Sequence, residues 1–228
     1  MASFYHSDLQ EAQEIELSPE ESQHLAKTLR GKVGDTITLF DGCGTKAQAT
    51  ILALPQRRGP VVCQITTCEN IPRPGYRIHL YVAPPRNKLL PQVVRQAVEL
   101  GVSDIHLIES DFSVVKGKGH ENLQKDILNA CKQSGNAYFT EIHPMLSFND
   151  ALAECTEDIY FGAVPTDPNI DPKRHQFPSE LAIWIGPEGG FSEKEKQALI
   201  DKDAKGICLG KWILRVETAV VALISKVL

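Results

Sequence analysis

The sequence of 228 residues lacks the features that would place a protein in a membrane, outside the cell or around a metal ion. No stretch approaches the roughly 18 consecutive apolar residues of a membrane span. The first residues, MASFYHSDLQ, have neither the basic nor the apolar region of a signal peptide. The six cysteines form no close C-x-x-C pair, and the seven histidines form no pair with ligand-like spacing. We therefore expect a cytoplasmic protein with reduced thiols, no membrane association and no metal.

The two common glycine fingerprints for nucleotides are also absent. Neither the phosphate loop G-x-x-x-x-G-K-[ST] nor the dinucleotide motif G-x-G-x-x-G occurs, which argues against phosphate-loop enzymes and Rossmann dehydrogenases. The net charge of −5 argues mildly against a general nucleic-acid binder, but basic residues gather locally. Residues 73–95 contain several basic side chains and no acidic one. These basic residues are either scattered surface charges or part of a local binding surface for an anionic partner. Both interpretations stay open.

Residues 1–72 have the texture of a small β-domain. Ser18, Pro19 and Glu21 give a capping residue, a first-turn proline and an acidic third position, so a helix should begin here and run to about Arg30. Apolar, β-branched runs at 36–40, 46–54 and 60–67 predict short strands, and their turns suggest a small barrel. The proline-rich stretch 71–75 then predicts a domain boundary.

From residue 73 onward, strand-like and helix-like segments alternate. This alternation predicts an α/β domain with a mainly parallel sheet covered on both faces, whose ligands lie beyond the carboxyl ends of the strands. A helix over about 87–100 should bury one face formed by Leu90, Val93, Val94, Ala97 and Val98. The expected strands are 76–83, 105–108, 159–164, 181–185 and 207–209, and the other expected helices are 121–134, 148–155, 192–204 and 216–228.

The stretch WIGPEGGFSEKE, from Trp184 to Glu195, places a glycine-rich loop between a strand and a helix. Ser192 and Glu195 form a capping box that starts the helix. Glu188 stands in the loop where a phosphate cradle would use a lysine. A carboxylate would repel a triphosphate but suits a cationic or hydroxyl-bearing ligand, and the glycines allow a flat group to approach the backbone. A purely structural turn is the alternative.

A second stretch, LGKWILRVETA from Leu209 to Ala219, repeats the order of strand, glycine turn and helix. Arg215 and Glu217 lie at the start of this helix. They form either a surface ion pair of little energetic value or part of a ligand site. Two loops of this kind at neighbouring strand ends favour a single pocket.

Together, IGPEGGFSEKE and LGKWILRVETA resemble the SPOUT-type methyltransferases, specifically the bacterial family that methylates N3 of a uridine in 16S ribosomal RNA of the small subunit. The segment HLAKTLRGKVGDTITLFDGCG resembles that family's PUA-like domain. The resemblance implies a PUA-like RNA-binding β-barrel over 1–72 and a SPOUT domain with a trefoil knot over 73–228. It also implies S-adenosylmethionine as cofactor, a homodimer formed through the knotted region, and ribosomal RNA, within the assembled small subunit, as partner.

The resemblance also assigns residues. Arg215 is the candidate to stabilise negative charge on the uracil or to bind a phosphate, and Glu217 is the candidate base or orienting carboxylate. The implied cofactor residues are Phe161, Gly162, Gly186, Pro187, Glu188, Gly189, Gly190, Leu209, Gly210, Ile213, Leu214, Thr218 and Ala219. The implied RNA-binding residues are Lys27, Arg30, Lys32, Arg86 and Lys88.

The sequence departs from the family pattern mostly on the side expected to face RNA. Asn136 stands where the family usually has an arginine, and Val216 replaces a threonine beside the expected pocket. Two alternatives therefore stay open: a methyltransferase of this class that acts on a different RNA nucleotide, and a non-catalytic RNA-binding relative.

Overall fold

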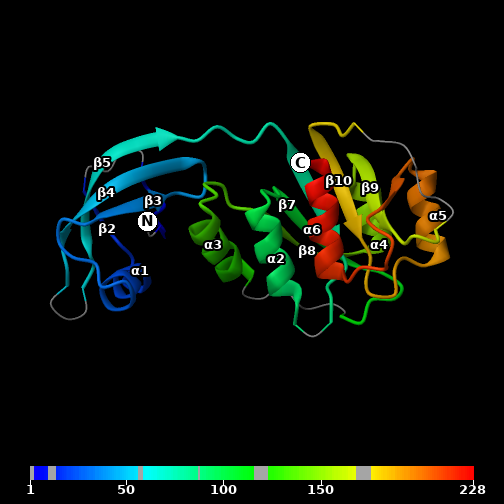
Figure 1. The fold of residues 1–228 in the computed structure, drawn as a ribbon, viewed down its shortest axis with the longest axis horizontal. Helices are drawn as coiled ribbons and strands as arrows, with labels where there is room; N and C mark the ends of the chain where they lie inside the picture. The colour runs from blue at the N-terminus through cyan, green and yellow to red at the C-terminus, as the bar shows by residue number, and fades with distance from the viewer. Residues whose placement is uncertain (1–2, 10–13, 56–58, 87, 116–122, 168–175) are drawn as a thin grey trace. The chain divides into compact units, whose positions relative to one another are not determined.

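A computed structural model describes residues 3–9, 14–55, 59–86, 88–115, 123–167 and 176–228 (Figure 1). The chain forms two compact units. The first comprises Met1–Arg73 together with Leu128–Phe139, and the second comprises Pro74–Ile127 and Thr140–Leu228. The prediction of a barrel domain over 1–72 and a catalytic domain over 73–228 did not anticipate that residues 128–139 pack with the first unit. The functional division itself stays a prediction.

The first unit is built on a curled sheet of mixed direction. Its strands run in the order β1-β3-β4-β5-β2; β1 pairs with β3 in parallel and the other pairs are antiparallel. Within the described ranges β1 and β2 are the two edges, so barrel closure stays a prediction. The strands are β1 Ser3–Tyr5, β2 Glu14–Glu16, β3 Thr36–Phe40, β4 Thr45–Ala53 and β5 Val62–Asn70.

The predicted helix start at Ser18 is confirmed. The Ser18 hydroxyl accepts a hydrogen bond from the Glu21 N–H at 3.2 Å, and Pro19 occupies the first turn of α1 (Pro19–Gln23). The helix then widens into one π-helical stretch, η1 (His24–Thr28), instead of continuing as an α-helix to Arg30. Arg30 itself has a positive φ of 54°, which ends the helical path.

Residues 128–139 pack with the first unit through polar and aromatic contacts. Lys132 Nζ lies 2.6 Å from Glu21 Oε2, and both side chains are largely buried. Tyr138 forms a β-bridge with Cys43, and the ring of Phe139 packs against Phe40 at a centroid separation of 5.8 Å.

The second unit contains a six-stranded sheet in which every pair is parallel, as the alternation predicts. The strand order is β11-β9-β10-β6-β7-β8. The edge strand β8 was not predicted, because Pro144 interrupts its apolar pattern; proline is tolerated at a sheet edge, where a strand is paired on one side only. The strands are β6 Arg77–Val82, β7 Asp104–Glu109, β8 Glu141–Ser147, β9 Asp158–Ala163, β10 Glu180–Ile185 and β11 Lys205–Cys208.

Helices flank this sheet. The predicted apolar face of α2 is buried, and α2 packs beside α6, which also contacts β10 (Figure 1). Residues from α4 and α5 join Tyr81, Phe161 and Trp184 in one apolar core. The helices are α2 Leu90–Glu99, α3 Leu123–Ser134, α4 Phe148–Glu154, α5 Glu193–Asp201 and α6 Val216–Val227. The expected starts of α2 at residue 87 and of α3 at residue 121 lie outside the described residues.

Among the described residues, no helix is long and apolar enough to cross a membrane. All six cysteines are free thiols. Burial raises the pKa of Cys63 to about 11 and that of Cys131 to about 12, so both thiols stay protonated at neutral pH.

Candidate functional site

A pocket opens at the carboxyl ends of three neighbouring strands, β9, β10 and β11, in the second unit. Its lining continues from these strands into the loops that follow them and ends on the first turn of α6. The pocket encloses about 580 Å³ of free space, including space open to solvent. This is the position at which open parallel sheets bind ligands, so the sequence-based expectation of one shared pocket is confirmed.

The loop after β10 depends on close backbone packing. A side chain at Gly186 would bring a Cβ to 3.1 Å from the backbone of Gly190 and Phe191. Gly190 has a positive φ of 74°, and its N–H donates to the Pro187 carbonyl at 2.8 Å, which closes the turn. Glycine therefore keeps the backbone itself at the pocket wall.

Glu188 joins this loop to the one after β6. Its carboxylate accepts a hydrogen bond from the backbone N–H of Arg86 at 2.8 Å, and its Oε2 lies 3.9 Å from the Arg86 guanidinium. The carboxylate lines the pocket but already has a cationic neighbour. Its negative charge is thus partly balanced within the protein.

The capping box predicted for α5 is present and does more than cap the helix. Ser192 and Glu195 exchange side-chain and backbone hydrogen bonds at 3.3 Å and 2.8 Å. Glu195 is buried and also accepts from the Ser110 hydroxyl and the Asp111 N–H. The segment after β7 is therefore fixed to the start of α5, beside the glycine loop.

The loop after β9 forms the third wall. Just before this loop, Gly162 near the end of β9 leaves room for the Ile185 side chain, because a Cβ at Gly162 would lie 3.0 Å from Ile185 Cδ1. Beyond it, Asp167 is buried and lies 3.5 Å from Lys196 Nζ. A hydrogen bond to Glu193, together with Asp167, raises the pKa of Lys196. This cation therefore stays charged and holds the loop against α5.

The start of α6 forms the fourth side of the pocket. Val216 and Ala219 line it. Arg215 is the N-cap residue of α6; its side chain is exposed and makes no capping hydrogen bond. Glu217 follows in the first turn and is half-buried. Arg215 and Glu217, the two candidate catalytic residues, therefore flank Val216, which lines the pocket. Neither of them is part of the lining itself.

The structure brings most of the predicted cofactor residues together and leaves three outside the lining. Phe161 is buried in the core beneath the pocket, whereas Gly189 and Thr218 lie beside lining residues. The predicted residues that do line the pocket are Gly162, Gly186, Pro187, Glu188, Gly190, Leu209, Gly210, Ile213, Leu214 and Ala219. The expected set omitted the apolar lining residues Ala163, Val164, Pro165, Ile185, Phe191 and Trp212, of which only the exposed Trp212 stands out as a signal. Val216, expected beside the pocket, is also part of the lining.

The predicted RNA-binding residues fall on both units. Lys27, Arg30 and Lys32 are all exposed, at the end of η1 and in the loop that follows. Arg86 and Lys88 are exposed in the loop after β6, where Arg86 also contacts Glu188.

A parallel sheet with a glycine-lined pocket at its carboxyl edge defines a ligand-binding α/β protein. The profile of the RNA methyltransferase domain family matches residues 72–228. The chain belongs to this RNA methyltransferase family.

Named relatives and a solved structure agree with this assignment. The ribosomal RNA small subunit methyltransferase E of Aquifex aeolicus is 35% identical over 147 residues, which span 60% of this chain and 62% of that protein. The protein of the same name from Rickettsia conorii is 27% identical over 98% of this chain and 93% of its own length. The crystal structure of the Neisseria gonorrhoeae enzyme of that name, bound to S-adenosylmethionine, is 26% identical with a TM-score of 0.86, covering 99% of this chain and 95% of that one.

Proposed function

We propose that this protein transfers the methyl group of S-adenosylmethionine to N3 of a uridine in 16S ribosomal RNA of the small subunit. The observation that carries the proposal is the glycine-lined pocket where β9, β10 and β11 end, in a chain of the RNA methyltransferase family. The relatives' names point to ribosomal RNA of the small subunit, and the Neisseria structure points to the cofactor.

The residues of the pocket suit such a cofactor. The close approach of backbone at Gly186 leaves peptide N–H and C=O groups as the available polar contacts for an adenine or ribose. Apolar neighbours such as Leu209, Ile213 and Leu214 cover flat or aliphatic groups. When bound, S-adenosylmethionine supplies a methyl group already activated by its sulfonium charge, so that positioning is the main task left to the protein.

The two charged residues at the start of α6 have complementary roles in the proposal. The N3 position of uridine carries a proton at neutral pH, so attack requires proton loss or stabilisation of the resulting anion. Glu217 accepts or orients that proton. Arg215 stabilises negative charge on the uracil oxygens, supported by the positive end of the α6 dipole and by backbone N–H groups that its own side chain leaves uncapped.

The remaining parts of the proposal concern assembly. Lys27, Arg30 and Lys32 on the first unit and Arg86 and Lys88 on the second contact RNA phosphates. The first unit is a PUA-like RNA-binding domain, and the second folds with a trefoil knot and forms the homodimer. The substrate is the assembled small subunit in the cytoplasm.

The test is transfer of labelled methyl groups to small ribosomal subunits that lack the uridine modification, with primer extension alongside. Because N3 methylation blocks base pairing, a new reverse-transcriptase stop is expected together with label. Label at another nucleotide would show that the target is that nucleotide and not N3 of the uridine. No transfer to subunits or to free ribosomal RNA, despite cofactor binding, would favour the non-catalytic relative.

The role of Arg215 is tested by Arg215→Ala in the same assay. Removing one charge-stabilising donor typically lowers kcat by about 10² to 10³, while the dissociation constant of the cofactor should stay within a few-fold. Lys211→Ala is the matched control, because Lys211 is an exposed cation of the same loop outside the pocket lining. Unchanged transfer by Arg215→Ala would remove this residue from the mechanism.

A further inference from the structure

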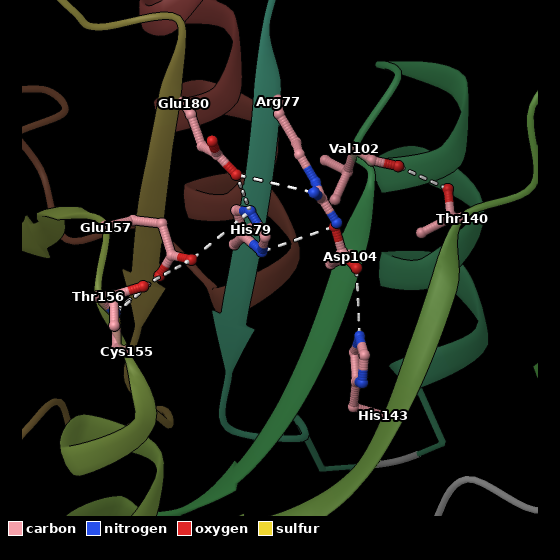
Figure 2. Close-up of polar contacts among 10 residues, drawn as sticks. All are labelled: Arg77, His79, Val102, Asp104, Thr140, His143, Cys155, Thr156, Glu157 and Glu180. Atoms are coloured by element: carbon pink, nitrogen blue, oxygen red, sulfur yellow. Dashed lines mark hydrogen bonds and ion pairs between the residues drawn. The ribbon is translucent and has the colours of Figure 1, made fainter.

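A second polar cluster lies at the amino ends of the strands, opposite the pocket. Its centre is His79 on β6, a residue with only 7% of its surface exposed. Figure 2 shows the imidazole between Asp104 of β7 on one side and Glu157 and Glu180, at the starts of β9 and β10, on the other. We refer to His79, Asp104, Glu157 and Glu180 as the His79 cluster.

Both ring nitrogens of His79 face carboxylates. Nδ1 lies 3.5 Å from Asp104 Oδ2, and Nε2 lies 3.1 Å from Glu180 Oε1 and 3.8 Å from Glu157 Oε1. A neutral imidazole has one N–H, so one nitrogen would turn a lone pair toward a carboxylate oxygen. Both nitrogens can therefore face carboxylates favourably only with a second proton on the ring or with a cation bound at one nitrogen.

Among the described residues, the cations paired with the cluster carry less charge than its carboxylates. Arg77 is the guanidinium at the cluster; it donates to Asp104 Oδ2 at 3.1 Å and lies farther, 3.8 Å, from Glu180 Oε1. With a neutral His79, three ionised carboxylates and one guanidinium leave two negative charges. A divalent cation would balance this charge.

The spacing on the Nε2 side is that of a coordination sphere. One oxygen each of Glu157 and Glu180 and one nitrogen of His79 lie within 4.8 Å of one another. Ligands about 2.0–2.2 Å from a zinc-like ion are roughly 3.3–3.6 Å apart in a tetrahedron, and the observed 3.1 Å and 3.8 Å bracket that range. The Glu180 side chain is 52% exposed, which leaves an entry path and room for water ligands.

Asp104 occupies the position of an outer-sphere partner. Histidines that bind metals usually donate their second N–H to a carboxylate, which fixes the tautomer and directs the free nitrogen to the ion. Asp104 Oδ2 faces Nδ1 at 3.5 Å and can orient the ring by its charge, and Asp104 is itself held by Arg77 and by His143, whose Nε2 lies 3.2 Å from Asp104 Oδ1.

We propose that the His79 cluster binds one divalent transition-metal ion through His79 Nε2, Glu157 and Glu180, with Asp104 orienting the imidazole. One imidazole and two carboxylates suit Zn²⁺ and its neighbours in the first transition row. The ion ties together β6, β9 and β10 at the edge opposite the pocket. Cys155 is not one of the proposed ligands; its thiol donates to Glu157 Oε2 at 3.3 Å, whereas the other carboxylate oxygen, Oε1, faces His79.

The probe is Co²⁺, added to the full chain after removal of metals with a chelator. We expect one equivalent to bind with visible d–d absorption and without the near-ultraviolet band of a thiolate ligand, and Zn²⁺ to displace it. Glu157→Gln and Glu180→Gln should each weaken Co²⁺ binding at least 100-fold. Asp104→Asn should weaken it about 10- to 100-fold, as expected for an outer-sphere partner.

Glu141→Gln is the matched control. Glu141 and His143 form, with Asp104, a neighbouring set of donors that does not include His79. Unchanged binding by Glu141→Gln supports the assignment, whereas loss in this variant with retention in Glu157→Gln would overturn it. A thiolate band, or no binding to the chelator-treated wild type, would also overturn it. Far-ultraviolet circular dichroism checks the fold of each variant, and the half-exposed Glu180 provides a variant that perturbs the core least.

Discussion

The Glu188 carboxylate receives the backbone N–H of Arg86 at 2.8 Å, and this single hydrogen bond joins the loops after β10 and β6 beside the pocket. It explains why a glycine-rich loop carries an acidic residue. The carboxylate holds a neighbouring loop in place, and its charge is shared with the Arg86 guanidinium. Glu188, which is expected to bind the cofactor, is thereby connected to Arg86, which is expected to bind RNA.

If Glu188 acts mainly as a hydrogen-bond acceptor, its amide should replace it better than alanine does. Glu188→Ala should weaken S-adenosylmethionine binding about 10-fold, since a hydrogen bond to a charged group contributes about 1.5–3 kcal/mol and this one is partly exposed. Glu188→Gln should stay within about 3-fold of the wild type. Isothermal titration calorimetry measures both. Equal losses in the two variants would show that the negative charge itself binds the ligand.

The glycine loop offers a second test, with a control inside the same pocket. In Gly186→Ala the new methyl group would meet the backbone of Gly190 and Phe191 at 3.1 Å, so the loop has to shift. Cofactor affinity should fall more than 10-fold. Gly210 also lines the pocket, but a Cβ there meets no atom within 4 Å, so Gly210→Ala should have little effect. A similar loss in both variants would contradict the packing argument.

His106 should make the stability of the second unit depend on pH. Its pKa is lowered to about 4 by burial and by the nearby His143 and His79, from an ordinary value of 6.5. The unfolded chain therefore binds more protons between these two values, and stability falls as the pH drops through this window. Between pH 7.5 and pH 5, the loss from this group is about 2 kcal/mol.

The measurement is urea unfolding at both pH values in the presence of a chelator, followed by tryptophan fluorescence of the buried Trp184. His106→Phe keeps a ring for stacking on Tyr81, whose centroid is 4.3 Å away, but cannot titrate. Its stability should change less between the two pH values than that of the wild type. An identical change in both proteins would assign the dependence to other groups.

The ion pair of Lys132 and Glu21 should be important for the first unit. Lys132→Met leaves the largely buried Glu21 carboxylate without its cation, and removing one partner of a buried pair costs about 3–5 kcal/mol. We expect about 3 kcal/mol, because Lys132 retains 17% exposure. Hydrogen exchange of β3 and β4 measures the loss.

A double variant serves as the control for this pair. Glu21→Gln combined with Lys132→Met removes both charges, so much of the stability should return. No recovery in the double variant would mean that Lys132 contributes through packing, for example over the Phe4 ring, which lies 5.4 Å from its nitrogen.

Local signals in the sequence predicted the elements near the pocket well. The Ser192–Glu195 capping box, the apolar face of α2 and the alternation of strands and helices each act within a few residues, and each is confirmed. Because the carboxyl ends of parallel strands lie at the same edge of a sheet, the two glycine loops could be predicted to form one pocket. Two local predictions failed. Pro144 interrupts the apolar pattern of β8, so this strand was not predicted, and no sequence signal distinguishes the π-helical turn after Gln23 from an α-helix.

Contacts between distant residues could not be predicted. The link between Glu188 and Arg86 and the attachment of residues 128–139 to the first unit depend on how the chain returns in space. The His79 cluster is a sharper case. The expectation of no metal rested on the absence of closely spaced ligands, whereas His79, Glu157 and Glu180 meet only because β6, β9 and β10 run side by side.

The attachment of Leu128–Phe139 to the first unit has a consequence for how the protein is made. Residues up to Arg73 are synthesised before this segment, and until it is made Glu21 lacks its ion pair with Lys132 and Phe40 lacks its contact with Phe139. We therefore expect the sheet of the first unit to reach its full stability only after β6, α2 and β7 have been synthesised. A fragment that ends at the proline-rich boundary would lack residues 128–139. Its sheet should therefore be less stable than the same sheet in the full chain.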